Sequence, residues 1–241
     1  MCGIVGIYLK TKKFEKNLGK MLSGMLNNME SRGPDSAGFA IYKEENKKNY
    51  KYSLCLNNTN VNDFEKKILR ILKKAQLSQF SDHVILKTSE NPKKMIKILS
   101  SNFPEVSIVG YGKSIEIFKQ IGNPKDIVKK FNLESFSGTH GIGHTRMATE
   151  SAITTDGSHP YSTGEDECLV HNGSLSNHNN LRRDLTKKGN VFNSENDTEV
   201  AAGYVSNNLS SKKSLKDTLT SGLKDLDGFY TFITGTRKGF A

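Results

Sequence analysis

The chain has 241 residues and a formal net charge of +10, and hydrophobic residues make up 35% of it. This length suits one large domain with a substantial core, and no apolar run is long enough to span a membrane or has the flanks of a signal peptide. Only six of the 35 basic residues are arginine, the side chain that phosphate and base readers favour, which argues against nucleic-acid binding.

The first third of the domain is predicted to contain a buried strand over 3–9, a helix, and a second strand over 38–42. The helix has one apolar face that runs from Phe14 to Met29 at helical spacing, and its methionines are interpreted as core. Gly33-Pro34 breaks the pattern before the second strand.

Residues 43–137 are predicted to form an inserted, lysine-rich α/β subdomain, because strand-like and helix-like runs alternate there. Residues 43–100 alone hold 13 basic and 6 acidic residues. We interpret this surplus as a solvated surface, with an acidic partner as the alternative. The expected strands are 52–56, 83–87 and 106–109, and the expected helices are 61–77, 95–99 and 124–131.

The remaining third returns to glycine-punctuated strands over 138–173, followed by helices over 178–188, 197–209 and 213–226. A strand over 229–234 and a turn at Arg237-Lys238-Gly239 follow, and the chain ends just after that turn. An end at this point leads us to expect a truncated C-terminus and a less stable fragment.

The cysteines lie at positions 2, 55 and 168, an odd number with no metal-like pairing, which favours a reducing cytoplasm. Cys55 and Cys168 lie in apolar runs and are expected to be buried and inert. Cys2 is different. If Met1 is removed, its thiol and a free α-amine belong to one residue, and an amine that titrates near ~7.7–8.0 can take the thiol proton.

Four polar segments lie at the ends of predicted strands or at the start of a helix, where loops place functional groups on a rigid scaffold. They are Ser31-Arg32-Gly33-Pro34-Asp35-Ser36-Ala37-Gly38, Gly143-His144-Thr145-Arg146-Met147-Ala148-Thr149, His171-Asn172-Gly173 and Ser194-Glu195-Asn196-Asp197-Thr198-Glu199.

These segments hold what an amide-cleaving thiol needs. Asn172 and Gly173 offer N–H donors for an oxyanion, Arg146 offers a fork for a carboxylate, and Asp197 offers an acceptor for an ammonium group, a set that fits glutamine. Taken singly, each has a structural alternative: Asn-Gly is often a turn, the arginine an ion-pair partner, and the aspartate a helix cap.

The histidines at 144, 159 and 171 can be structural or can suggest a metal site with a cysteine. Their spacings match no standard zinc pattern, so we expect neither a metal nor a cofactor.

Taken together, the segments resemble the class II glutamine amidotransferases, which are N-terminal-nucleophile hydrolases. The resemblance is carried, in the family's order, by Met1-Cys2-Gly3-Ile4-Val5-Gly6, Arg32-Gly33-Pro34-Asp35-Ser36-Ala37-Gly38, Gly143-His144-Thr145-Arg146, His171-Asn172-Gly173 and Asp197-Thr198-Glu199.

The resemblance implies an α+β fold, a four-layer αββα sandwich, and a mature N-terminus at Cys2 that attacks the glutamine amide and forms a glutamyl thioester. It implies that Asn172 and Gly173 form the oxyanion hole. It also implies that a loop over 147–158 covers bound glutamine. The residues expected to bind substrate are Arg146, Asp197, Arg32 and His171.

The chain departs from the sugar-aminating members, which have tryptophan where it has Met147, and from sugar-aminating and phosphoribosyl-transferring members at Pro34. Residues 138–151 and 170–182 are most similar to GlxB-type subunits, related to glutamate synthase and N-methylglutamate synthase, with synthase functions on separate chains. A glutaminase subunit that supplies nitrogen to a separate synthase is therefore expected. The alternatives are the amidotransferase domain of a phosphoribosyl- or sugar-aminating enzyme, a stand-alone amidohydrolase, and a non-catalytic subunit.

Overall fold

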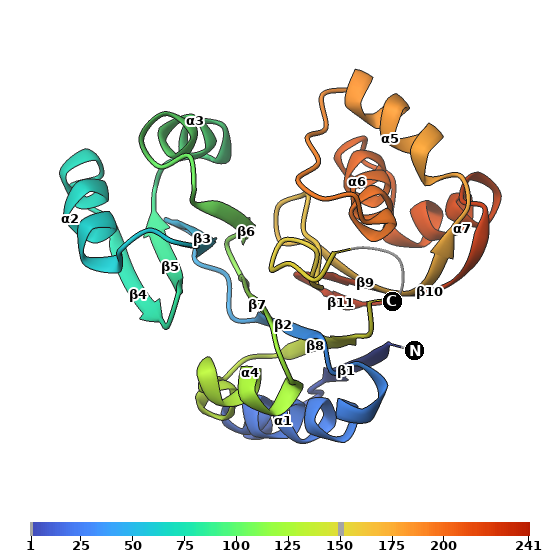
Figure 1. The fold of residues 1–241 in the computed structure, drawn as a ribbon, viewed down its shortest axis with the longest axis horizontal. Coiled ribbons are helices and arrows are strands. Elements are labelled where there is room, and N and C mark those ends of the chain that lie inside the picture. The colour runs from blue at the N-terminus through green and yellow to red at the C-terminus, as the bar shows by residue number, and fades with distance from the viewer. Residues whose placement is uncertain (1, 149–151) are drawn as a thin grey trace.

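Two stacked sheets, each covered by helices on its outer side, form the main body of the protein (Figure 1). The structure is a computed structural model and describes residues 2–148 and 152–241. The first sheet has the strand order β1 (Gly3–Tyr8), β8 (His140–Arg146), β2 (Ser36–Tyr42) and β7 (Ile115–Ile121). The second has the order β11 (Gly239–Phe240), β10 (Gly228–Thr236) and β9 (Cys168–Leu175).

Helices α1 (Leu18–Asn28) and α4 (Pro124–Lys130) cover the first sheet, together with the short 3-10 turns η1 (Lys12–Asn17), η2 (Glu30–Arg32) and η3 (Leu133–Ser135). Helices α5 (His178–Lys187), α6 (Asp197–Ser210) and α7 (Leu215–Asp225) lie outside the second sheet. The order of layers is helix, sheet, sheet, helix, which confirms the predicted αββα sandwich.

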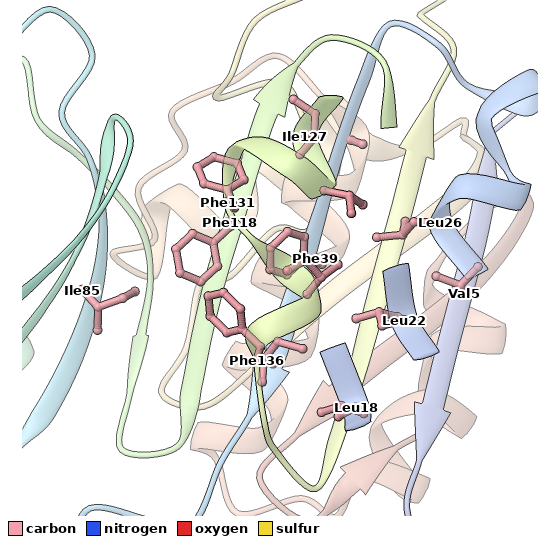
Figure 2. Packing of buried hydrophobic residues seen from close by; sticks show 14 residues of the cluster. Val5, Leu18, Leu22, Leu26, Phe39, Ile85, Phe118, Ile127, Phe131 and Phe136 are labelled. Carbon is pink, nitrogen blue, oxygen red and sulfur yellow. The ribbon is translucent and has the colours of Figure 1, made fainter. Parts of the chain in front are cut away.

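The core under α1 follows from the spacing of its leucines. Leu18, Leu22 and Leu26 lie four residues apart and are buried in one apolar cluster with Phe39 and Phe118 of the first sheet (Figure 2). Burying one such side chain stabilises the fold by roughly 1.5–3 kcal/mol.

Phe14 does not belong to this stripe. Its side chain is 43% exposed, because η1 precedes α1 and changes the helical phase before Leu18. The expectation that the apolar face begins at Phe14 was wrong.

A second apolar layer joins the two sheets. Tyr42 and Ile142 of the first sheet pack there with Cys168 and Val170 of β9. Cys55 belongs to the same cluster, and both it and Cys168 are buried free thiols, as expected.

The inserted region forms a third sheet with two helices on one face (Figure 1). Its elements are β3 (Tyr50–Cys55), α2 (Val61–Ile71), β4 (Gln76–Phe80), β5 (His83–Thr88), α3 (Pro92–Asn102) and β6 (Ser107–Gly112), with strand order β4-β5-β3-β6. The antiparallel pairing and the βαββαβ connectivity make this a ferredoxin-like subdomain.

This subdomain is shorter than the predicted insertion over 43–137. Strand β7 pairs with β2, and α4 packs on the first sheet, so both belong to the main body. The strand β7 was not predicted, because Glu116 and Lys119 interrupt its apolar pattern. Glu116 is buried between Lys43 and Lys51, at 2.6 and 3.1 Å. The helix expected over 61–77 also ends at Ile71, and β4 follows it.

Across residues 2–148 and 152–241, no helix combines the length and the apolar character that crossing a bilayer requires.

Candidate active site

The ends of strands from both sheets meet around one cavity of about 500 Å³. Cys2 precedes β1, and Arg146 ends β8, which pairs with β1. Six of the seven predicted site residues line this cavity: Cys2, Arg146, His171, Asn172, Gly173 and Asp197. Arg32, the seventh, does not.

Cys2 is half-buried at the cavity wall, with its Sγ 3.9 Å from the carbonyl oxygen of Met147. Its own carbonyl accepts a hydrogen bond of 3.2 Å from Arg32 Nε. Arg32 therefore holds the main chain of the cysteine. It lines a neighbouring cavity of about 270 Å³ that also borders Cys2 and Asn172. Met1, whose removal would create the free amine, lies outside the described residues.

The Arg32-Gly33-Pro34-Asp35 segment packs against the end of β8. A Cβ at Gly33 would lie 2.4 Å from the carbonyl carbon of Thr145, so only glycine permits this approach. Asp35 N–H donates to the carbonyl of Arg146 at 3.1 Å, and its carboxylate accepts from Ala148 N–H at 2.8 Å. The motif thus fixes the backbone on both sides of Arg146.

Gly173 requires glycine for a different reason. Its φ is +138°, and a Cβ would lie 2.0 Å from the carbonyl oxygen of Phe229 on β10. Residues other than glycine rarely adopt this backbone conformation. It presents the Asn172-Gly173 pair at the cavity wall, where N–H donors can face a reacting carbonyl.

Asp197 begins α6 but does not cap it, because the side chain of Asn196 accepts the Thr198 N–H at 2.9 Å. One Asp197 oxygen accepts Leu175 N–H at 2.8 Å, and the other lies 3.6 Å from His171 Nδ1. Burial alone would raise the pKa of Asp197. The contacts with His171 and the Leu175 N–H outweigh burial and hold that pKa below its usual value. The carboxylate is therefore anionic at neutral pH and suits an ammonium group.

Three histidines pack together at the cavity wall, two of them against the hydroxyl of Thr198. The Thr198 oxygen lies 2.9 Å from both His159 Nε2 and His171 Nδ1. His144 Nε2 donates to the carbonyl of His171 at 2.8 Å, and its ring stacks on His159 with centroids 3.8 Å apart. Burial lowers the pKa of His144 to about 3 and that of His159 well below its ordinary value, so both rings are neutral. In the described part of the chain, no three His, Cys, Asp or Glu side chains are arranged to hold a metal ion.

These neutral histidines predict an acid-sensitive fold. The unfolded chain binds protons near pH 6.5, whereas the folded His144 binds them only near pH 3, so stability falls as pH drops below about 6.5. Each such histidine steepens the loss by about 1.4 kcal/mol per pH unit. Urea unfolding at pH 7, 6 and 5 measures this slope. His159→Gln is expected to reduce it by about that amount, and an unchanged slope would contradict the assignment.

Residues 133–233 match the glutamine amidotransferase domain family. The whole chain is 47% identical to the glutamine amidotransferase-like protein GlxB of Rhizobium meliloti and covers 81% of that protein. The chain belongs to the class II glutamine amidotransferases. It is also 32% identical, over 99% of its length and 83% of the relative, to a putative glutamine amidotransferase of Methanothermobacter thermautotrophicus.

A solved structure supports the fold of this amidotransferase. The structure of the allosteric regulatory enzyme of purine biosynthesis matches 98% of the chain with a TM-score of 0.60 at 18% identity, and the chain covers 36% of it. Because the identity is low, this similarity shows the fold alone.

The amidotransferase cavity has further lining residues that sequence reasoning did not assign. They are Met147, His159, Ser174, His178, Glu195, Asn196 and Thr198. Several belong to polar segments that the sequence singled out. The contacts of Thr198 with two histidines depend on β9, α6 and the segment before Tyr161 meeting in space, and no local pattern signals that.

Proposed function

We propose that this amidotransferase hydrolyses glutamine with Cys2 as its nucleophile. The observation that carries the proposal is the single cavity that Cys2 shares with the Asn172-Gly173 pair, Arg146 and Asp197. These groups supply a nucleophile, oxyanion donors and one clamp for each charged end of a free amino acid.

The reaction runs in two stages. Cys2 Sγ attacks the side-chain carbonyl carbon of glutamine, and its proton passes to the α-amine that Met1 removal creates. The tetrahedral oxyanion accepts hydrogen bonds from Asn172 Nδ2 and Gly173 N–H. The C–N bond breaks, the amine returns the proton to the leaving nitrogen, and ammonia departs from a glutamyl thioester. Water then attacks the thioester and releases glutamate and the thiol.

Two charged groups favour glutamine over a simple amide. Arg146 binds the α-carboxylate through its guanidinium fork, and Asp197 accepts from the α-ammonium group. Both line the cavity with Cys2, which supports a free amino acid as the substrate. His171 lies against Asp197 and holds that carboxylate in place, with 3.6 Å between Nδ1 and the nearer oxygen.

We also propose that a synthase on a separate chain receives the nitrogen. The 47% identity to the GlxB protein along the whole chain supports this assignment, as does the sequence similarity to GlxB-type subunits. If so, the purified chain alone should release ammonia and glutamate in equal amounts. Less ammonia than glutamate would point to an acceptor within this chain.

Covalent labelling tests the proposed nucleophile. A glutamine-analogue diazoketone is expected to add one equivalent to Cys2, detected by peptide mass spectrometry, and excess glutamine should slow the labelling. Intact mass of the same sample shows whether Met1 is removed. An unlabelled Cys2 in a folded protein that lacks Met1 would contradict the proposed nucleophile.

A further inference from the structure

A short segment links two parts of the glutamine site. Residues 152–158 follow Arg146 and precede His159, and both of these residues line the cavity. Arg146 Nη1 donates to the carbonyl of Ala152 at 3.3 Å. The position of residues 152–158 therefore affects the position of the guanidinium proposed to bind the α-carboxylate.

The edge strand β7 holds this segment through two consecutive side chains. Lys119 Nζ donates to the carbonyls of Asp156 and Ser158, at 3.0 and 2.9 Å. Thr155 Oγ1 donates to Gln120 Oε1. Neighbouring residues of a strand point to opposite faces, so the segment contacts both sides of β7.

Gln120 also reaches the ferredoxin-like subdomain. Its Nε2 donates at 2.5 Å to Asp82, in the turn between β4 and β5. Asp82 also accepts from Lys130 Nζ at 2.9 Å and lies 3.0 Å from His83 Nδ1. Burial alone would raise the pKa of Asp82. The contacts with His83 and Lys130 outweigh it and hold that pKa well below its usual value. The carboxylate is thus an anion, and hydrogen bonds to an anion are the stronger kind.

Aromatic packing of Phe80 and His83 against Phe118 also joins the hairpin to the main body, and the polar contacts above lie beside it. A further cavity of about 620 Å³ flanks this junction, lined by Asn57 and Glu105 of the subdomain, Gln120 of β7, and Thr154 and Asp156 of the segment. Since open space adjoins the segment there, neighbouring side chains do not replace a hydrogen bond that is removed.

We propose that Gln120 is a positioning residue for the glutamine site, through which the inserted subdomain sets the place of residues 152–158 and hence of Arg146. The connection runs from Asp82 through Gln120 and Thr155 to the segment that carries the Ala152 carbonyl. A displacement of the β4–β5 turn then changes the affinity for glutamine without touching Cys2. The proposal rests on the proposed glutaminase function.

Steady-state kinetics of three variants test the connection. Gln120→Leu, Thr155→Val and Asp82→Ala are each expected to raise the KM for glutamine about fivefold, the equivalent of one ordinary hydrogen bond. The kcat should stay within about twofold, because the oxyanion donors are untouched. Gln76→Leu is the matched control. It is an exposed glutamine at the other end of β4, away from the turn that carries Asp82, and should leave both constants unchanged.

Pairwise variants distinguish a connection from general damage to the fold. If Asp82 acts on the segment through Gln120, Asp82→Ala should add little to the KM of Gln120→Leu, although each substitution alone raises KM about fivefold. Independent, additive effects would overturn the proposal, and so would a KM in Thr155→Val equal to that of the wild type. Thr155→Val is nearly isosteric and avoids the loss of the Lys130 ion pair that Asp82→Ala entails.

Hydrogen exchange separates this proposal from the glutaminase proposal. The amides of 152–158 should exchange faster in Gln120→Leu, whereas those of β3 and β5 should not change. If the wild type hydrolyses no glutamine, the proposed function fails, and exchange still decides whether Gln120 holds the segment. Unchanged exchange at 152–158 overturns the connection whatever the activity.

Discussion

Cys2→Ala is expected to reduce glutamine hydrolysis by about 10⁴-fold or more, because the reaction loses the atom that forms the thioester. The substitution removes a half-buried Sγ atom that lies 3.9 Å from the carbonyl oxygen of Met147. Folding should be unaffected. Glutamine binding, followed by calorimetry, should persist, since Arg146 and Asp197 remain in the cavity.

The other two cysteines give a matched control. Burial raises the pKa of Cys168 to about 12 and also raises the pKa of Cys55, so both remain protonated thiols. Cys55→Ala and Cys168→Ala should keep kcat within about twofold of the wild type, since neither thiol lines the cavity that contains Cys2. Full activity in Cys2→Ala, or a comparable loss in Cys55→Ala, would refute the role of Cys2.

Parts of the candidate site that consist of short contiguous motifs could be recognised from the sequence. Arg146 ends β8, as its segment predicted, whereas Asn172 and Gly173 lie inside β9, which continues to Leu175. The structure adds the reason for the glycines. Gly33 allows contact with the Thr145 carbonyl, and Gly173 adopts a φ of +138°. The structure also places Arg32 against the main chain of Cys2, outside the cavity that the other predicted site residues line.

Features that depend on distant partners were not predictable. Strand β7 carries Glu116 and Lys119, whose charges suggest surface residues. In the structure Glu116 pairs with Lys51, and Lys119 donates to the carbonyls of Asp156 and Ser158. Thr198 likewise reads as an ordinary first-turn residue of a helix, and only the fold brings it 2.9 Å from both His159 and His171.

The ferredoxin-like subdomain shows the same limit at the level of topology. The βα alternation was visible in sequence, but periodicity alone did not separate the end of α2 from the short strand β4. Nor did the lysine surplus reveal what the subdomain contacts. One of its contacts with the main body is made by Asp82, an acidic residue within that basic region, which accepts a hydrogen bond from Gln120 of β7.

Asn172→Ala is expected to lower kcat by about 10²–10³-fold, the usual effect of removing one oxyanion donor. The KM should stay within about twofold, because the negative charge on the glutamine oxygen develops only after Cys2 attacks. Asn172 lines both of the cavities that Cys2 lines, which places this residue beside the nucleophile. Steady-state kinetics with glutamine separate the two constants.

Asn172→Asp is the matched variant, since it keeps the shape and replaces the donor with an acceptor that repels the oxyanion. It should lose at least as much kcat as Asn172→Ala. A variant whose defect lay in KM alone would show that Asn172 binds ground-state glutamine, and the oxyanion would then depend on Gly173 N–H without help from this side chain.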